Sequence, residues 1–379
     1  MLANNIAIFL MLFVFALSII DKKIQFKINR LNYFLILIFF FSTISIIYSC
    51  DTSSGFKVLE KYLVFLIFPI SIQLSGIGEK RIQIIKYAFV LSVVLVFFYA
   101  LLLAGYYSIQ TGTTSVFNPE NLVLENRFTY HRLMENANIS ATVFALYLTL
   151  SIVILFETFI IKKSHSKHRL KAILLIGFLG LIIALMNSFT AYMALGVISI
   201  STAYYLKIKL KYYLFFLIPI LLSITFFSIK TKGIDKDIFK YNLTDDIHNT
   251  NWNSLNVRLA KWECTLNVIK ETFPFGIGVG CAQKTLNKKY KEMGFQVGYD
   301  KKFSTHNQFL HYLLESGIIT LLLFITLLVY GLYYSIKKKN YYLYTILILL
   351  SISSLTDNFL IVNKGIVFFA FFICLASKD

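Results

Sequence analysis

The chain has 379 residues, of which 57% are hydrophobic and only 15% are charged. This composition is too apolar for a soluble globular domain and predicts a polytopic membrane protein. The formal net charge of +18 could suggest a nucleic-acid partner. In membrane proteins, however, Lys and Arg collect in cytoplasmic loops for topological reasons. Most of the excess lies in short loops between apolar segments, so we expect no nucleic acid as a partner.

Apolar segments follow one another along most of the chain. A hydrocarbon core about 30 Å thick needs roughly 20 apolar residues per helix. No Lys or Arg precedes the first segment, which therefore predicts a retained helix and not a secretory signal. The predicted fold class is an all-α polytopic membrane protein of about eleven membrane helices, near 4–20, 32–49, 58–75, 84–105, 138–161, 170–187, 190–206, 212–229, 308–334, 341–357 and 359–376.

Positive charge sets the expected orientation. Every second loop carries Lys and Arg, beginning with Lys22 and Lys23 after the first helix. Short basic loops stay in the cytoplasm, which places the N-terminus outside and the C-terminus inside. A long loop translocates largely regardless of its charge, so the segment after the eighth helix faces outward. The sequence predicts three parts: membrane helices one to eight (1–229), one large periplasmic loop (230–305) and the final helices (306–379).

The large loop predicts amphipathic helices and no soluble domain with a core of its own. Its first helix carries four apolar residues at helical spacing: Leu259, Trp262, Leu266 and Ile269. This face should lie on the membrane or on the helix bundle. A second, basic helix is predicted over 285–293.

Between these two helices lies the pattern Gly276-x-Gly278-x-Gly280, preceded by Pro274. A nucleotide-binding loop would need a strand before it, the Rossmann spacing, or a Gly-Lys-Ser/Thr end. The sequence has none of these. We therefore expect a turn packed closely against the membrane domain.

The four cysteines have no spacing typical of a metal site. Cys264 and Cys281 share the large loop and could pair in an oxidising compartment. Two free thiols are the alternative. Cys50 and Cys374 complete the set.

His306 lies where the large loop meets the ninth predicted helix. A histidine side chain titrates near neutral pH, so it can take a proton from a hydroxyl group. The neighbouring Asn307 could bind a sugar or orient a partner. The alternative is a loop histidine that caps the following helix. His311, five residues further on, would not share a helical face with His306, so a pair of metal-binding histidines is not expected.

Three arginines face outward in this topology: Arg127, Arg132 and Arg258. Arginine suits phosphate through its bidentate fork, so these residues are candidates for binding a lipid diphosphate. Snorkelling to lipid headgroups is the alternative for each. Arg127 and Arg132 flank Tyr130 and His131.

With these residues in view, the chain resembles the O-antigen ligase and polymerase superfamily of bacterial membrane glycosyltransferases, and most of all its Bacteroidota-type ligases. His306 and Asn307, then nine residues, then Gly317 are similar to the ligase pattern His-Asn, nine residues, Gly-x-x-Gly. Thr320 replaces the second glycine of that pattern.

Residues upstream follow the family order too, with two departures. Many relatives have Ser-Arg where this chain has Ser188 and Phe189, and relatives often have twelve helices. The matching positions are Arg258, Trp262, Pro274, Gly276, Gly278, Gly280, Tyr290 and Gly294, together with the segment 128–133.

The resemblance implies a C-type glycosyltransferase of the bacterial inner membrane whose active site faces the periplasm. It would transfer a glycan from undecaprenyl diphosphate to lipid A-core, without metal or cofactor and with inversion at the anomeric carbon. His306 would share the proton of the acceptor hydroxyl while Arg258 and Arg132 hold the diphosphate. The expected substrate-binding residues are Arg127, Asn307, Tyr130 and His131.

Several alternatives remain at this point. An O-antigen polymerase or a protein O-oligosaccharyltransferase would use the same donor with another acceptor. A polysaccharide flippase or other transporter is an alternative of a different class. Acidic residues inside the predicted helices are few, which disfavours an ion-coupled transporter.

Overall fold

The computed structural model describes residues 28–112, 117–118, 123–124, 126–162, 165–205, 241–245, 252 and 254–378. These residues are almost entirely helical. Turns and loops connect the helices, and the strands among the described residues are one antiparallel pair of two-residue strands, β1 (Phe117–Asn118) and β2 (Val123–Leu124). An all-α membrane protein is therefore confirmed as the fold class.

The helices pack into two compact units, and each unit gathers segments far apart in the sequence. The described residues of unit 1 come from 28–76, 241–343 and 353–378, and those of unit 2 from 77–205 and 344–352. Helix α15 (Tyr341–Thr356) contributes to both. The predicted three-part division of the sequence stays a prediction.

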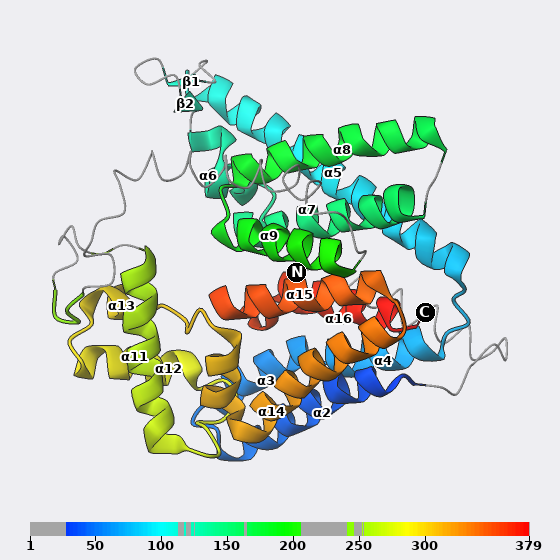
Figure 1. The fold of residues 1–379 in the computed structure, drawn as a ribbon. Helices are drawn as coiled ribbons and strands as arrows, with labels where there is room; N and C mark the ends of the chain where they lie inside the picture. The colour runs from blue at the N-terminus through cyan, green and yellow to red at the C-terminus, as the bar shows by residue number, and fades with distance from the viewer. Residues whose placement is uncertain are drawn as a thin grey trace. The chain divides into compact units, whose positions relative to one another are not determined.

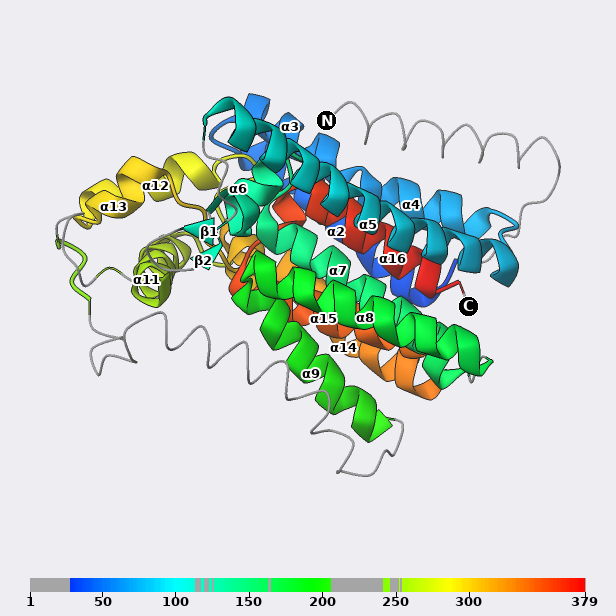
Figure 2. The ribbon, with the colours of Figure 1, turned by 90° about the horizontal axis from the view of Figure 1, so that it is seen from above.

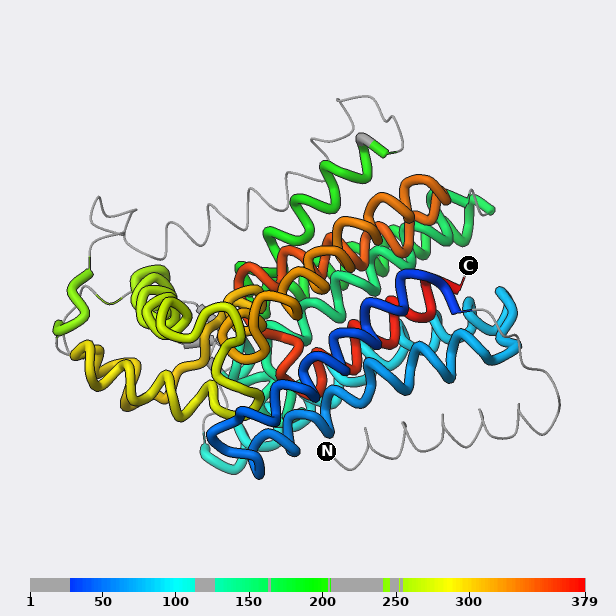
Figure 3. Tube along the Cα trace, turned by 90° about the horizontal axis from the view of Figure 1, so that it is seen from below, coloured from blue at the N-terminus to red at the C-terminus, as the bar shows by residue number. Residues whose placement is uncertain are grey.

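In unit 1, α14 packs along α2, while α4 packs on α2 and α16 (Figures 1 and 3). Helix α2 begins after Asn29, whose side chain accepts a hydrogen bond from the N–H of Leu31 and so caps the helix. The helical elements of unit 1 besides α15 are α2 (Arg30–Ile44), η1 (Ser45–Tyr48), α3 (Thr52–Tyr62), α4 (Val64–Leu74), α11 (Ser254–Thr272), α12 (Ala282–Glu292), α13 (Gln296–Lys301), α14 (Gln308–Lys337), η5 (Phe359–Ile361) and α16 (Asn363–Ala376).

Helix α2 shows why these segments suit a bilayer. It buries Leu31, Leu35 and Ile38 on one side, at the spacing of a single helical face. Its other side exposes Phe40 and Ile44, which are equally apolar. A helix that is apolar on its exposed side as well is typical of contact with lipid.

In unit 2, helix α7 is buried on nearly all sides because α5, α8 and α9 pack around it (Figure 2). A buried ion pair joins α5 to η3, with Lys86 Nζ 3.3 Å from a carboxylate oxygen of Glu157. Pairing offsets part of the cost of burying both charges. The helical elements of unit 2 are α5 (Glu79–Gln110), η2 (Asn126–Phe128), α6 (Tyr130–Glu135), α7 (Ala141–Leu155), η3 (Phe156–Ile161), α8 (Ser166–Met186) and α9 (Phe189–Tyr205).

Five described helices are long and apolar enough to cross a membrane: Arg30–Tyr48, Glu79–Gln110, Ala141–Ile161, Ser166–Met186 and Gln308–Lys337. Each corresponds to a predicted span. Three further predicted spans, 190–206, 341–357 and 359–376, correspond to shorter apolar helices.

The other predicted spans are not matched by single long helices. The span 58–75 divides at Leu63 into α3 and α4. The predicted helices 4–20 and 212–229 lie outside the described residues. The total of eleven spans and the outward orientation of the large loop therefore stay predictions.

The helices of the large loop pack around a hydrophobic core that they share with α14, which contributes Leu314. Helices α11, α12 and α13 pack around buried residues that include Cys264 and Tyr290 (Figure 1). The buried apolar residues of α11 are Ala260, Cys264, Val268 and, from the predicted face, Ile269, whereas Leu266 of that face is 43% exposed. The small side chains of Ala260 and Cys264 leave room for the large ring of Tyr290 in the same core. Close packing between the helices therefore decides which side of α11 is buried.

The glycine segment 274–280 docks on α14 through main-chain hydrogen bonds. In an unbroken helix the N–H of Ile318 would bond to the carbonyl of Leu314. Instead, the N–H of Ile318 donates to Pro274 and the carbonyl of Leu314 accepts from Ile277, both at 2.9 Å. These groups are free for docking because α14 is interrupted at Gly317, which has φ +78° and ψ −172°.

The predicted close-packed turn is thereby confirmed. Gly278 has φ +86°, and a Cβ atom placed on it would lie 2.5 Å from the Cα of Ser49. The carboxylate of Glu315 accepts a hydrogen bond of 2.8 Å from the N–H of Gly280. The glycines allow the main chain to approach the membrane helices without a side chain between them.

Cys281 forms a disulfide with Cys50, at a Cα–Cα distance of 5.7 Å. The expected alternatives, a Cys264–Cys281 pair or two free loop thiols, were both wrong. Cys264 is buried on α11 in the loop core, and burial raises the pKa of its thiol to about 12. Cys281 lies instead at the start of α12, where the disulfide joins the large loop to the segment between η1 and α3. Such a bond is typical of an oxidising compartment.

We expect denatured, unreduced protein to react with maleimide at two cysteines, Cys264 and Cys374, because Cys50 and Cys281 are bonded. After reduction all four should react. Cys50→Ser should release one further thiol, which mass spectrometry would locate at Cys281. Reaction at all four cysteines before reduction would contradict the disulfide.

Candidate active site

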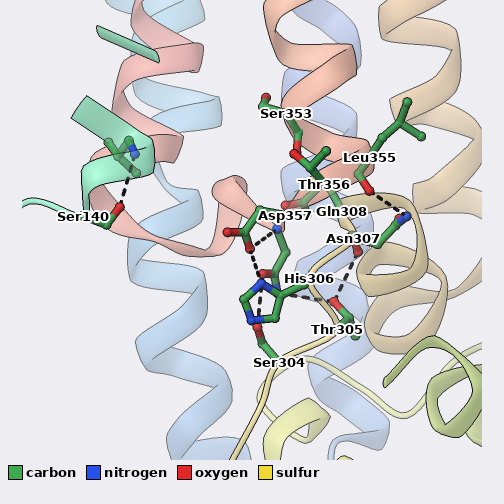
Figure 4. A network of polar contacts seen from close by, with 12 residues as sticks. Ser140, Ser304, Thr305, His306, Asn307, Gln308, Ser353, Leu355, Thr356 and Asp357 are labelled. Carbon is green, nitrogen blue, oxygen red and sulfur yellow. Dashed lines mark hydrogen bonds and ion pairs between the residues drawn. The ribbon is translucent and has the colours of Figure 1, made fainter. Parts of the chain in front are cut away.

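His306 lies in the short segment between α13 and α14, within a network of polar contacts (Figure 4). Its backbone has φ +46°, in the left-handed region that residues other than glycine seldom adopt. The preceding Thr305 is held from α11, since the indole Nε1 of Trp262 donates a 3.1 Å hydrogen bond to its carbonyl. Asn358 donates to the Thr305 hydroxyl at 3.3 Å. Strained backbone held from two sides is common at functional sites.

The imidazole of His306 pairs with a carboxylate. Its Nδ1 lies 3.1 Å from Oδ1 of Asp357, which follows α15, and both side chains are partly exposed. Burial opposes ionisation of Asp357. Three neighbours outweigh this effect of burial and hold the pKa of Asp357 below its ordinary value. They are His306, through its hydrogen bond and charge, the N–H of Asn358, and the charge of Arg258. With Nδ1 directed at the carboxylate, Nε2 is the nitrogen that can accept a proton.

Asn307 has a structural position in this site. Its side-chain oxygen accepts a 3.0 Å hydrogen bond from the N–H of Leu310 and caps α14, while its amide nitrogen donates to the carbonyl of Leu355 at 3.4 Å. These bonds join the start of α14 to the end of α15 next to His306. A contact between Asn307 and a sugar stays a prediction.

Two cations extend from α11 toward the His306–Asp357 pair. Arg258 is half-buried, and within the described residues no hydrogen bond or ion pair engages its guanidinium group. Its charge acts on Asp357 and on Lys261, one turn further along α11. Lys261 is buried, with Nζ 4.4 Å from the ring centroid of Phe303. The site therefore combines a base with cations that can hold an anion.

A second set of predicted residues lies in unit 2, around a cleft of about 240 Å³ lined by Ala104, Tyr107, Arg127, Arg132, Glu135 and Asn136. Nη1 of Arg127 donates to the carbonyl of Tyr107 at 2.7 Å and to the hydroxyl of Thr111 at 2.6 Å. Arg127 thus binds the carboxyl end of α5. Arg132 makes no such hydrogen bond to another described residue. Of the two arginines in this cleft, Arg132 is therefore the one more available to bind an anion.

Tyr130 and His131 begin α6 beside the cleft residues. Their rings lie 3.8 Å apart between centroids. Burial lowers the pKa of His131, and the charge of Glu135 partly opposes this change. A neutral His131 could accept a hydrogen bond from a sugar hydroxyl, and that role stays a prediction.

Of the predicted site residues, the structure brings Arg258, His306 and Asn307 together in unit 1. The remaining four, Arg127, Tyr130, His131 and Arg132, belong to unit 2. Sequence reasoning missed Asp357 and Lys261 as site residues. Asp357 carried a usable signal, because an acid at the end of the predicted span 341–357 falls on the same side of the membrane as His306.

Comparison with known proteins gives two matches. Residues 172–325 match a family model described as O-antigen ligase. This range includes Arg258, Lys261 and His306, but neither Arg132 nor Asp357. An uncharacterized protein of Haemophilus influenzae is 28% identical over 244 residues, which cover 61% of this chain and 58% of that protein. The matched part of the chain thus spans little more than half of that relative's length.

Proposed function

We propose, from the match of residues 172–325 to the O-antigen ligase family, that the chain transfers an undecaprenyl-diphosphate-linked glycan to lipid A-core. The apolar helices and this family make it a bacterial membrane protein with a glycosyltransferase-type domain. The donor, the acceptor and the periplasmic location of the reaction are the proposal.

The observation that carries the proposal is the His306–Asp357 pair. Asp357 orients the imidazole and stabilises the imidazolium that forms when Nε2 takes a proton. The acceptor hydroxyl oxygen, as it loses this proton, bonds to the anomeric carbon of the donor sugar. The bond from that carbon to the diphosphate oxygen breaks on the opposite face, so the configuration inverts.

The leaving diphosphate departs as an anion and needs cations next to the base. The guanidinium group of Arg258 on α11 has no hydrogen bond or ion pair to the part of the chain that the structure describes, and Arg258 lies within the range that matches the family. A guanidinium fork can bind two phosphate oxygens at once. We assign Arg258 the first contact with the diphosphate. A role of Arg132, and more weakly of Arg127 because of its bonds to α5, in binding the same diphosphate stays a prediction from the sequence.

The Cys50–Cys281 disulfide supports the proposed orientation. It joins the two segments that the charge pattern places outside, the short loop near Cys50 and the large loop. Disulfides persist in the periplasm and are rare in the cytosol. A periplasmic site is also where a lipid-linked glycan would meet lipid A-core.

The test uses purified protein in nanodiscs, with an undecaprenyl-diphosphate glycan and three separate acceptors: lipid A-core, a second lipid-linked glycan, and an acceptor protein. Glycosylated lipid A-core is the expected product. Arg258→Ala should reduce transfer about 10²-fold or more, because a cation at the leaving group is lost. Lys270→Ala, at the exposed end of the same helix, is the matched control and should keep full activity.

Each other outcome contradicts the ligase assignment. A product on the lipid-linked glycan indicates a polymerase, and a product on the protein indicates an oligosaccharyltransferase. Movement of the donor across the bilayer without transfer to any acceptor indicates a flippase.

A further inference from the structure

Lys261 is a buried cation without an anionic partner among the described residues. The residue is 3% exposed, and its Nζ lies over the face of the Phe303 ring, 4.4 Å from the centroid. The same Phe303 ring lies 6.3 Å from the imidazole of His306. Lys261 is therefore placed at the candidate site and not at a solvated surface.

Two other lysines of low exposure in the described residues have carboxylate partners, whereas the partly buried Lys61 and Lys378 donate to main-chain carbonyls. Lys86 lies 3.3 Å from Glu157, and Lys289 lies 2.7 Å from Glu271. Burial of an unpaired ammonium group is unfavourable, and one aromatic face offsets only part of that cost. A lysine kept only for packing would fit better as an apolar residue. The position of Lys261 instead indicates an anion that arrives with the substrate.

The charges around Lys261 come from three elements. Arg258 lies one turn earlier on α11, Asp357 follows α15, and His306, paired with Asp357, precedes α14. Burial, reinforced by the positive charge of Arg258, lowers the pKa of Lys261 to about 7, while Asp357 partly opposes this change. A bound anion would favour the ammonium form.

We propose that Lys261 is a further cationic contact, beside Arg258, for the diphosphate of the lipid-linked donor. This inference rests on the proposed function for the identity of the donor. Arg258 and Lys261 are three residues apart on one helix and so share a face, which allows both to reach one diphosphate.

The direction of the pH effect follows from the charge of the free protein. Below pH 7 Lys261 is mostly ammonium and the anion site is complete. As the pH rises through about 7 the ammonium fraction falls, and binding of the diphosphate must then bring a proton with it. Donor affinity should decrease by up to about tenfold per pH unit above that point, because one proton is linked to binding.

The experiment measures binding of undecaprenyl diphosphate to the full chain in nanodiscs, from pH 6 to 9. The chain has two tryptophans. Trp252→Phe leaves Trp262, the neighbour of Lys261, as the reporter of fluorescence. In this background we compare Lys261→Met, which removes the charge, Lys261→Arg, which makes it permanent, and Lys288→Met, an exposed lysine of α12, as the control.

We expect Lys261→Met to bind at least about tenfold more weakly at pH 6 and to lose the pH dependence between 7 and 9. Lys261→Arg should bind at pH 9 as tightly as at pH 6, and Lys288→Met should match the parent protein. The intact Cys50–Cys281 bond and an unchanged melting temperature establish that each variant is folded.

Parent-like affinity and pH dependence in folded Lys261→Met would overturn the proposal. So would folded Lys261→Arg that binds diphosphate like the parent at every pH. Binding does not depend on the acceptor, so normal diphosphate binding without transfer to any acceptor would refute the proposed function and leave this inference standing.

Discussion

His306→Ala should lower the rate of glycan transfer about 10²- to 10⁴-fold, the usual contribution of a general base. The substitution removes the only group of the His306–Asp357 pair that can take a proton from the acceptor hydroxyl at neutral pH. Binding of undecaprenyl diphosphate should be nearly unchanged, because Arg258 and Lys261 remain. Steady-state transfer kinetics in nanodiscs, with separate donor titrations, would measure both quantities.

Asp357→Asn is the matched variant for the same pair. It keeps the size of the side chain but removes the charge that orients the imidazole, so we expect transfer to decrease roughly 10²-fold. The pKa of Asp357 is lower in the folded protein than in the unfolded chain. Its favourable interaction with His306 is therefore fully present above the ordinary pKa of aspartate, and it is lost only when the pH falls through the pKa of the folded state. Titration of Asp357 should therefore not limit activity between pH 5 and 7.

Unchanged transfer by the His306→Ala variant would remove His306 as the base. Activity lost by His306→Ala but fully kept by Asp357→Asn would leave His306 in place and reject Asp357 as its orienting partner.

Gly317→Ala should separate the large loop from α14. The backbone at Gly317, with φ +78° and ψ −172°, is essentially restricted to glycine and costs another residue about 1–3 kcal/mol. A Cβ atom there would also lie 2.5 Å from the carbonyl oxygens of both Pro274 and Phe275. These main-chain atoms cannot move without breaking the hydrogen bond from Ile318 to Pro274.

We expect Gly317→Ala to lower the melting temperature of the protein in detergent and to reduce transfer more than tenfold, since α11 carries Arg258 and Lys261 from the large loop. Faster proteolysis within 254–305 would locate the change. Gly180→Ala in α8 is the control, because a Cβ atom there meets no atom within 4 Å. It should be neutral or slightly stabilising. Wild-type stability in Gly317→Ala would show that the docked turn contributes little.

Features that depend on neighbouring residues could be read from the sequence. Apolar length predicted the helices over 84–105, 138–161 and 308–334, and each is present with ends shifted by a few residues. The spacing of Gly276, Gly278 and Gly280 predicted a closely packed turn. The orientation of α11 was predicted only in part, because several of its faces carry apolar residues and the helices packed on it, α12 and α14, decide which side is buried.

The partners of the site residues could not be predicted in the same way. His306 was identified from its place at the end of the large loop, but its carboxylate partner is Asp357, on the far side of α14 and α15 in sequence. Cys281 likewise bonds to Cys50, 231 residues away, and not to Cys264 in its own loop. The periodicity of apolar residues indicates which side of one helix is buried. It does not indicate which helix ends lie next to each other in the folded chain.

By itself, the sequence determined the membrane class, the helical segments, the glycine turn and His306 as the candidate base, since these follow from local hydrophobicity, spacing and side-chain chemistry. Only the tertiary structure decided that Asp357 pairs with His306, that Lys261 is buried near Arg258 with no carboxylate at ion-pair distance among the described residues, and that Gly317 opens α14 to the loop. The physical reason is that a pKa, a buried charge and a docked backbone depend on groups brought together from distant segments, and the energy of those contacts exists only in the folded chain.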